Sequence, residues 1–452
     1  MARTAPITLL AAIVALALPG AVAAKAPPGD EEAVIVLTRD AAGDGGEAGG
    51  LLRGAADAAG LELARAVPEI GVGSVDLPAG ASVADLRAAL AGEPGIAAVE
   101  PNVRLELRAV DDPAYTANDP NAPGADSFQW HLRKSGFTRA WKRSNGSRAT
   151  VAVIDTGADA AHPDIGPQVE AAFDKDHTLL HGGADVDENG HGTHVSGLAC
   201  ARTDDGFGVA SAGNRCGLLV YKTDLRISSI SESIVEATDR GADVINMSFG
   251  GDETSKALAS AVKHAAARDV LMVAAADNDD VDGSGNPSED QGIPADYLQP
   301  VGSGPHRKRG TGLVVTAAEY DGSRAWFGPG MGTGISLAAY GSAGEGQRGI
   351  FSTFPGDLTE IESLELCRIC RGELSGDRRF GYLEGTSMAT PQVAGAAALI
   401  RSASPKLSAR RVAEILKRSA TSRSLGYTPE LGWGIVNANR ALRVAIAKGK
   451  RR

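Results

Sequence analysis

From about residue 150 onward, apolar residues follow two alternating patterns. Short runs of Val, Ile, Leu and Ala are typical of strands buried on both faces of a sheet, and the longer segments between them space their apolar residues as amphipathic helices do. The predicted strands are residues 150–155, 217–222, 243–249 and 270–276, and the predicted helices are 229–240, 253–268, 390–401, 408–419 and 436–447. Strands that alternate with helices in this way predict a doubly wound, mostly parallel α/β sheet.

A smaller pattern precedes this region. Its strand-like segments are 32–37, 75–77 and 96–102, and its helix-like segments are 46–59 and 82–92. With one further strand expected before Val75, this order is the βαββαβ order of a ferredoxin-like fold. We therefore expect residues 30–107 to form a small α+β domain ahead of a larger domain at 115–447.

The first residues have the composition of a secretory signal peptide. In residues 1–24, Arg3 precedes an apolar stretch, and the small residues Ala21 to Ala23 suit a cleavage site. The stretch is too short to be convincing as a membrane anchor, and no other segment is long enough to span a bilayer. The mature chain is thus expected to be soluble and secreted, without a membrane partner. The net charge of -11 argues against nucleic acid as a partner.

Three polar residues stand where such a fold presents side chains to a ligand. Asp155 ends an apolar strand, and His191 lies at a loop-to-helix junction. Ser387 follows Gly385 at a predicted helix start, where unpaired N–H groups stabilise a developing negative charge, and Pro391 is expected in the first turn. A hydroxyl, an imidazole that takes its proton and a carboxylate that orients the imidazole are the set that serine hydrolysis needs.

These three segments, in the order Asp, His, Ser, resemble those of the subtilisin-like serine proteases. The resemblance implies that Asp155 is the orienting acid, His191 the general base and Ser387 the nucleophile. The segment 270–278 resembles the family's strand that ends in the oxyanion asparagine, so Asn278 would be the side-chain donor beside the backbone N–H of Ser387. The resemblance covers about residues 115–440, and its start is thermitase-like.

The resemblance also implies where a peptide substrate binds. Backbone pairing with an extended substrate is assigned to Ser248, Phe249, Gly250 and Gly251, and further pocket positions are Ala276 and Asp277. The family usually has Gly where this chain has Asp277. Two interpretations of Asp277 stay open: it fills the same turn and points to solvent, or it faces the primary specificity pocket and favours a basic residue there.

A bound Ca²⁺ is a further implication of the family resemblance. Carboxylates would come from Asp119, Asp164 and Asp205, and backbone carbonyls from Arg202, Phe207 and Val209. An all-oxygen set of this kind suits Ca²⁺ rather than zinc. The alternative is that the three acids are solvated residues of surface turns. No organic cofactor is expected.

The N-terminal domain resembles the inhibitory propeptide of the same family, in its position and in its ending at Val99 to Asn102. By that resemblance it would assist folding and then lay its C-terminal end in the cleft. The cut would fall between about Leu105 and Tyr115, after Leu105 or Leu107 if the pocket prefers large apolar residues. The alternative is a binding module that the mature protein retains.

Four cysteines in an exported chain suggest disulfides. Cys200 ends the His191 helix and Cys216 opens the next strand, so their pairing is sterically plausible. Cys367 and Cys370 have the spacing of a redox or metal motif, but a local disulfide is preferred because two thiolates alone make an incomplete zinc site. Both lie in a segment, about 357–380, that looks inserted and either borders the cleft or decorates the surface.

Together these features predict a secreted, monomeric, calcium-stabilised serine endopeptidase. It would hydrolyse polypeptides through an acyl-enzyme and be made as a self-processed precursor that its own propeptide inhibits. One alternative is a narrowly specific processing protease for basic sites. The other is a catalytically silent homologue that only binds peptides.

Overall fold

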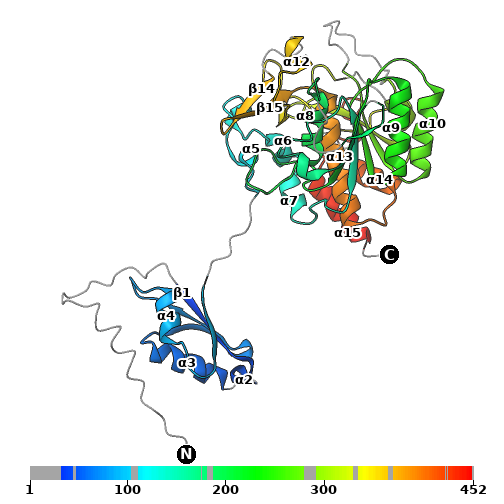
Figure 1. The fold of residues 1–452 in the computed structure, drawn as a ribbon. Helices are drawn as coiled ribbons and strands as arrows, with labels where there is room; N and C mark the ends of the chain where they lie inside the picture. Colours follow the sequence, from blue (N-terminus) through cyan, green and yellow to red (C-terminus); the bar gives the residue numbers. More distant parts are fainter. Residues whose placement is uncertain are drawn as a thin grey trace, which may run out of the picture. The chain divides into compact units, whose positions relative to one another are not determined.

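The computed structural model describes residues 32–43, 47–102, 110–174, 176–180, 187–278, 292–328, 334–364, 370–422, 424 and 426–449. The predicted signal peptide, the candidate cleavage residues Leu105 and Leu107, and Cys367 lie outside these residues. The chain divides into an N-terminal unit, Met1–Leu107, and a C-terminal unit, Arg108–Arg452 (Figure 1).

The N-terminal unit has the predicted ferredoxin-like topology. Its elements are β1 (Glu32–Leu37), α2 (Arg39–Ala42), α3 (Ala48–Ala58), β2 (Leu63–Val67), β3 (Val72–Asp76), α4 (Val83–Ala89) and β4 (Ile96–Pro101). The strand order is β2-β3-β1-β4, and every neighbouring pair is antiparallel. The additional strand expected before Val75 is β2. Ser82 caps α4, and its capping box with Asp85 satisfies N–H groups that the helix leaves unpaired.

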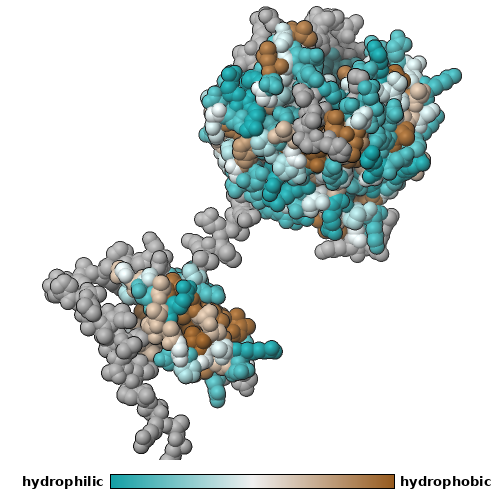
Figure 2. All heavy atoms as spheres, viewed as in Figure 1, coloured by the Kyte–Doolittle hydropathy of each residue, from teal (hydrophilic) through white to brown (hydrophobic). Residues whose placement is uncertain are grey.

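The two faces of this small sheet differ. Ile35 of β1 points into a core that Leu52 of α3 and Leu86 of α4 complete. Val34 and Val36 alternate with the core residues and are only partly buried, so the opposite face carries apolar side chains that none of the described helices covers. Figure 2 shows hydrophobic residues on the visible surface of this unit.

The C-terminal unit is built on a mostly parallel sheet. Its strands are β5 (Thr150–Asp155), β6 (Val169–Phe173), β7 (Leu179–Leu180), β8 (Gly217–Lys222), β9 (Val244–Met247), β10 (Leu271–Ala275), β11 (Gly312–Ala318) and β12 (Leu337–Tyr340). Their order is β12-β11-β10-β9-β5-β8-β6-β7, and only β6 and β7 pair antiparallel within the described residues. The predicted doubly wound α/β fold is therefore confirmed.

Helices cover both faces of this sheet (Figure 1). The longer helices are α8 (His191–Cys200), α9 (Ile227–Asp239), α10 (Lys256–Ala267), α13 (Thr386–Ala403), α14 (Ala409–Ser419) and α15 (Ala438–Gly449), and the shorter ones are α5 (Pro113–Thr116), α6 (Trp130–Lys134), α7 (Phe137–Trp141) and α11 (Ala295–Leu298). Val151 and Val153 share a core with α8 and α13, whereas Ala152 and Ile154 share the other core with α9 and α10. Because successive side chains of a strand point to opposite faces, a continuous apolar run places β5 in both cores.

A small antiparallel sheet joins the inserted segment to the rest of the C-terminal unit. It consists of β13 (Ile350–Thr353), β15 (Asp377–Leu383) and β14 (Arg371–Leu374), in that order, and the short helix α12 (Glu360–Ser363) precedes β14. Arg371 fixes the segment because its guanidinium bonds both carboxylate oxygens of Glu362 and the carbonyls of Pro355, Asp357 and Arg378.

A disulfide joins Cys200 and Cys216, as predicted, and ties the end of α8 to the strand that follows. Cys370 is also disulfide-bonded, and its predicted partner Cys367 lies outside the described residues. Among the described helices, none combines the length and apolar character that a membrane span requires.

Candidate functional site

Three of the predicted site residues lie at, or shortly after, the C-terminal ends of neighbouring strands of the large sheet. Asp155 ends β5, Ser248 follows β9 and Asn278 follows β10 shortly after its end; these strands are adjacent in the order β10-β9-β5. Because the strands are parallel, their C-terminal ends lie at one edge of the sheet. That edge is where open α/β sheets bind ligands.

Asp155 and His191 are in direct contact. Nδ1 of His191 lies 2.7 Å from Oδ1 of Asp155, and the Asp155 carboxylate is 2% exposed while the imidazole is 23% exposed. Burial alone would lower the pKa of His191, but the charge of Asp155 and its hydrogen bond outweigh burial and raise that pKa above its ordinary value. The carboxylate thus fixes the ring so that Nε2 is the nitrogen available for chemistry.

The start of α8 packs against the loop after Asp155 with no space to spare. A Cβ at Gly192 would lie 2.0 Å from the carbonyl oxygen of Gly157, so only glycine allows the helix to begin here. His194, one turn further on, is fully buried and its Nε2 bonds the carbonyl of Ile350. Burial lowers the pKa of His194 to about 3, which keeps it neutral and structural.

Asp187 organises this region, although the sequence analysis did not single it out. Its Oδ1 accepts from the Gly190 N–H at 2.9 Å and the Thr156 hydroxyl at 2.8 Å, and its Oδ2 accepts from the N–H and hydroxyl of Thr193, both at 2.7 Å. It is 1% exposed. Asp187 therefore joins the end of the Asp155 strand to the beginning of the His191 helix. An acid shortly before a helix start was the one signal in the sequence.

Ser387 lies at the second position of α13, which begins at Thr386 rather than near Thr390. The expectation that Pro391 lies in the first turn is therefore wrong: it lies inside the helix. A proline there has no N–H to offer the carbonyl of Ser387. The hydroxyl of Ser248 donates to that carbonyl at 3.0 Å instead, and the hydroxyl of Ser387 donates to the carbonyl of Ser248 at 2.9 Å.

Asn278 is oriented by the residue before Ser387. Its Oδ1 accepts from the N–H of Thr386 at 2.9 Å and from the Thr386 hydroxyl at 3.0 Å, so the amide nitrogen is the end left for another partner. A Cβ at Gly385 would lie 3.3 Å from Nδ2 of Asn278 and 3.5 Å from the backbone N of Ser387. Glycine at 385 thus keeps open a space that both N–H donors border.

The predicted substrate-binding residues line the extensions of β9 and β10. The carbonyl of Gly251 is already bonded by the N–H of Ile293 at 2.8 Å. Ala276 is buried and its N–H bonds the carbonyl of Val315. Asp277 has a positive φ of 67°, and its Oδ1 accepts from the N–H of Asn278 at 2.8 Å. The usual glycine of this turn is thus replaced by one of the few residue types that tolerate its backbone angles.

The inserted segment reaches the loop that precedes His191. The N–H of Glu360 donates to the carbonyl of Glu188 at 2.8 Å, and the Asn189 side chain donates to the Glu360 carboxylate at 3.2 Å. Leu358 and Leu364 flank this contact and are 75% and 66% exposed. Of the two interpretations of the insert, the one that places it beside the site residues agrees with these contacts.

The acids predicted to bind Ca²⁺ are only partly brought together. Asp164 and Asp205 are neighbours, and burial together with the charge of Asp205 raises the pKa of Asp164 to about 8. Oδ2 of Asp164 accepts from the N–H of Val209 at 2.9 Å, while its buried Oδ1 has no hydrogen-bond partner among the described residues. Asp119 makes other contacts, with the hydroxyl of Tyr382 and the backbone and side chain of Asn121.

Asp112, which the sequence analysis passed over, is the third acid of this cluster. It is fully buried and accepts from the N–H groups of Asp204 and Asp205, and burial raises its pKa to about 7. Among the described residues, no group of three or more His, Cys, Asp or Glu side chains is placed to hold a metal ion by side chains alone. Any ion at Asp164 would need backbone carbonyls as further ligands.

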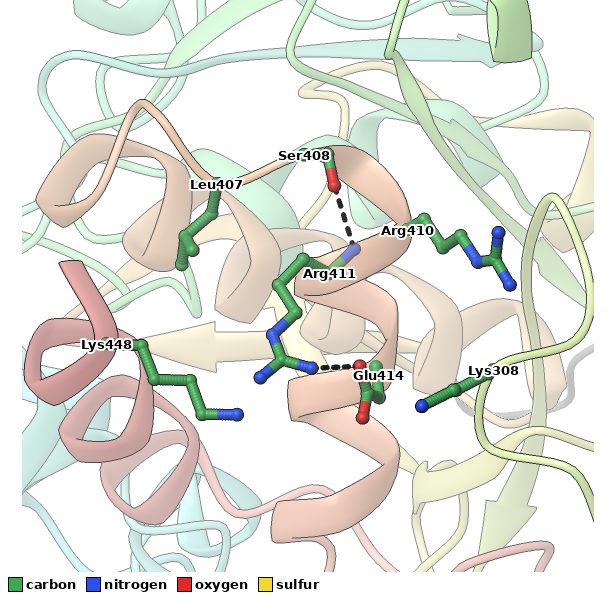
Figure 3. Close-up of a pocket in the computed structure, with 7 residues that line it drawn as sticks. All are labelled: Lys308, Leu407, Ser408, Arg410, Arg411, Glu414 and Lys448. Carbon is green, nitrogen blue, oxygen red and sulfur yellow. Dashed lines mark hydrogen bonds and ion pairs between the residues drawn. The ribbon is translucent and has the colours of Figure 1, made fainter. Parts of the chain in front are cut away.

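A hollow of about 600 Å³ lies elsewhere on the C-terminal unit, beside α14 and α15 (Figure 3). It is lined by Lys308, Leu407, Ser408, Arg410, Arg411, Glu414 and Lys448. None of these is a predicted site residue, so its size alone does not make it the catalytic cleft.

Comparison with known proteins decides the family. A family model described as the subtilase family matches residues 146–434. The chain belongs to the subtilase family. A second model, described as the fervidolysin N-terminal prodomain, matches residues 47–102 of this subtilase, within the N-terminal unit.

Individual relatives agree with this assignment. The subtilase is 33% identical to subtilisin BL of Lederbergia lenta over 71% of this chain and 100% of that protein, and 30% identical to thermitase of Thermoactinomyces vulgaris over 73% and 99%. Its fold is similar to that of fervidolysin from Fervidobacterium pennivorans, a keratinolytic enzyme related to subtilisin, with a TM-score of 0.57 at 23% identity. That alignment covers 93% of this chain and 62% of the other. The chain is therefore a serine endopeptidase with an N-terminal prodomain, as predicted.

Proposed function

We propose that Asp155, His191 and Ser387 form the catalytic triad of this endopeptidase. The observation that carries the proposal is the 2.7 Å contact between the Asp155 carboxylate and Nδ1 of His191, at the sheet edge where Ser387, in the first turn of α13, bonds Ser248. Asp155 would hold the imidazole in the tautomer whose Nε2 accepts a proton and would stabilise the imidazolium that results.

The reaction requires the Ser387 hydroxyl to leave its present partner. It now donates to the carbonyl of Ser248, and rotation of the side chain would turn it toward Nε2 of His191. Transfer of the proton to His191 lets Oγ attack the peptide carbonyl, and the imidazolium then protonates the leaving amine. His191 next takes a proton from water, which attacks the acyl carbonyl. The bond between that carbon and Oγ of Ser387 then breaks, the imidazolium returns the proton to Oγ, and the second product leaves as a carboxylic acid.

Two donors would stabilise the negative charge on the substrate oxygen. They are Nδ2 of Asn278 and the backbone N–H of Ser387, which border the space that Gly385 keeps open. Loss of the corresponding asparagine donor in subtilisin costs about 3 to 4 kcal/mol of transition-state stabilisation. We expect a loss of similar size in Asn278→Ala, seen in kcat rather than in KM.

The peptide would lie along the extension of β9. Since the carbonyl of Gly251 is already bonded by Ile293, the backbone groups of Phe249 and Gly250 are the ones we assign to pairing with an extended substrate. Backbone pairing of this kind is independent of substrate side chains. Selectivity must then come from the groups that flank it.

The N-terminal unit is proposed to be an inhibitory propeptide that the enzyme removes from itself. Support comes from the match of residues 47–102 to a prodomain and from the uncovered apolar face that includes Val34 and Val36, a surface suited to packing on another domain. Residues 30–107 would be the propeptide and 115–447 the catalytic domain.

The test of both proposals is mass spectrometry of the full chain beside its Ser387→Ala variant. Only the wild type should lose the segment before about Tyr115, and the isolated N-terminal segment should inhibit the mature enzyme. If Ser387→Ala is processed equally well without another protease present, Ser387 is not the nucleophile.

A structural Ca²⁺ is proposed at Asp164. The support is its buried oxygen that has no partner among the described residues, together with the nearby carboxylates of Asp112 and Asp205. A divalent cation would offset the cost of burying Asp164 and Asp112 beside the charge of Asp205. Calcium at about 100 times its Kd would stabilise the fold by about 2.7 kcal/mol. The Tm should rise with Ca²⁺ and fall with a chelator.

Variants can identify the acids that bind the ion. In Asp164→Asn the calcium dependence of the Tm should disappear. Asp112→Asn tests the acid that lies in the cluster, and Asp119→Asn tests the acid that the family resemblance implies. A Tm that does not respond to Ca²⁺ in the wild type would contradict the site.

Secretion and a monomeric state also remain predictions, which size-exclusion chromatography of exported protein would check.

A further inference from the structure

The Asp277 side chain lies against Gly250, across the gap between two strand extensions. A Cβ at Gly250 would be 3.4 Å from Oδ2 of Asp277 and 3.5 Å from its Cγ. Gly250 follows β9 and Asp277 follows β10, which are adjacent parallel strands. The carboxylate is thus directed toward the neighbouring extension, and the interpretation that it only points away into solvent is not supported.

Both extensions are attached to Ser387 or its neighbour. The Ser248 carbonyl and hydroxyl bond Ser387, and the Asp277 carbonyl lies 3.0 Å from the hydroxyl of Thr386, whose one proton is shared between this carbonyl and Oδ1 of Asn278. A substrate side chain held at this edge by an acylated Ser387 would therefore lie beside Gly250 and the Asp277 carboxylate, which are neighbours. That side chain belongs to the residue on the acyl side of the scissile bond.

One oxygen of the Asp277 carboxylate is free to take a partner. Oδ1 accepts the N–H of Asn278, whereas Oδ2 has no hydrogen bond or ion pair to any residue that the structure describes. The side chain is half-buried, so water screens its charge only in part. A basic substrate side chain would place its cation beside Oδ2.

The charge also matters for the oxyanion. Asp277 directly precedes Asn278, the proposed side-chain donor, so its negative charge opposes the negative charge that develops on the substrate oxygen. A substrate cation beside Asp277 would neutralise that opposition, whereas a neutral side chain would leave it in place. Charge pairing would therefore act on the transition state as well as on binding.

We propose that Asp277 selects substrates with Lys or Arg on the acyl side of the scissile bond. This inference rests on the proposed function, because it assigns specificity to the same site. The competing interpretation is steric: Asp277 only fills volume and selects a small residue. The two differ in whether the charge of the side chain matters.

The precursor itself offers a matching sequence. Arg104 and Arg108 lie between the last described residue of the N-terminal unit and the first of the C-terminal unit. The inference predicts maturation after an arginine rather than after Leu105 or Leu107, and Arg108, the first residue of the C-terminal unit, is the expected position. N-terminal sequencing of the mature enzyme reads the bond directly, and Arg108→Gln should slow its formation or move it to Arg104.

The decisive experiment compares kcat/KM for matched peptide substrates that carry Arg, citrulline, Ala or Phe before the scissile bond. Citrulline keeps the shape of arginine without its charge. The wild type should prefer Arg to citrulline by at least about tenfold, which corresponds to about 1.4 kcal/mol. Asp277→Asn keeps the volume, the positive φ and an acceptor for the Asn278 N–H, and should abolish this preference.

Two further variants complete the test. Asp277→Gly should also lose the preference for Arg and gain activity toward Phe, because glycine removes both charge and volume. Asp252→Asn is the control: it removes an exposed charge two residues after Gly250 and should keep the wild-type preference for Arg. Equal rates for Arg and citrulline, a preference for Ala, or a preference for Arg that survives in Asp277→Asn would each overturn the inference.

The failure of the inference is distinct from that of the proposed function. Cleavage that depends on Ser387 but ignores the charge of the substrate leaves the triad intact and removes only the role of Asp277. If the wild type shows no cleavage that is lost in Ser387→Ala, both the proposed triad and the role of Asp277 are overturned.

Discussion

Ser387 and Ser248 bond each other reciprocally: each hydroxyl donates to the other residue's backbone carbonyl, at 2.9 and 3.0 Å. Pro391, inside α13, cannot donate to the carbonyl of Ser387, so that carbonyl is left to accept from the hydroxyl of Ser248. The extension of β9 is thereby fixed to the beginning of the helix that carries the proposed nucleophile.

Ser248→Ala should leave the Ser387 carbonyl without a partner and destabilise the protein by about 1 to 3 kcal/mol, because a buried unpaired acceptor retains its desolvation cost. Chemical denaturation measures the loss, and kcat should fall with it. Adding Pro391→Ala restores an N–H to the helix, so the double variant should be more stable than Ser248→Ala alone. If the two changes are simply additive, the carbonyl of Ser387 is not what links them.

Activity should depend on pH through His191. Asp155 raises the pKa of His191 although burial opposes it, and the reaction needs the neutral ring, so kcat/KM should fall on the acid side from a pH above the ordinary histidine value of about 6.5. In Asp155→Asn the charge is gone, so this acid limb should move to lower pH and kcat should drop on the order of 10⁴-fold. The pH profile of kcat/KM for both proteins checks this. An acid limb that stays in place would mean that another group controls it.

Asp187 is expected to matter for both stability and activity. The two carboxylate oxygens of Asp187 accept four hydrogen bonds, whereas the side chain of Asn in Asp187→Asn has only one acceptor oxygen. Hydrogen bonds to a charged group are worth about 1.5 to 3 kcal/mol each. We expect a loss of about 3 kcal/mol in unfolding free energy and a lower kcat, because the His191 helix loses its tie to the Asp155 strand.

Glu188→Gln is the matched control for Asp187→Asn. Glu188 is adjacent in sequence, but its side chain is 61% exposed and its ion pair with Lys222 lies at the surface. Such a pair contributes about 1 kcal/mol or less. Equal destabilisation in the two variants would contradict the role given to Asp187.

Sequence patterns predict the features of the fold that are set by residues close together in the chain, and they miss those set by tertiary contacts. The strand 217–222 was predicted with the bounds that β8 has, because a buried apolar run between polar residues marks its own ends. The start of α13 was placed too late because Pro391 suggested a first turn, and the compensating hydroxyl comes from Ser248, far away in sequence. Motif resemblance likewise named Asp119 for the acid cluster, whereas Asp112 reaches it through backbone contacts that only the tertiary path of the chain creates.

The hollow beside α14 and α15 is lined mostly by basic residues, so we expect the stability of the protein to depend strongly on Glu414 (Figure 3). Glu414 is the only acid among the residues that line it, its carboxylate pairs with Arg411 and, at 3.1 Å, with Arg418, and its side chain is 7% exposed. Glu414→Gln would leave these guanidinium groups and the nearby lysines to repel one another. We expect a loss of about 1 to 3 kcal/mol near neutral pH, smaller at high salt because ions screen the repulsion.

The pH dependence of this loss has a definite sign. Burial would raise the pKa of Glu414, but its bond to Arg411 and the surrounding positive charges outweigh burial and lower it. A carboxyl whose pKa is lower in the folded state stabilises the protein above its unfolded pKa, about 4.3, and loses that contribution as the pH falls through the folded value. The difference between wild type and Glu414→Gln in thermal unfolding should therefore be full at pH 7 and shrink below about pH 4. Glu430→Gln, at an exposed position, should show neither effect, and a difference that persists unchanged in acid would contradict the pairing.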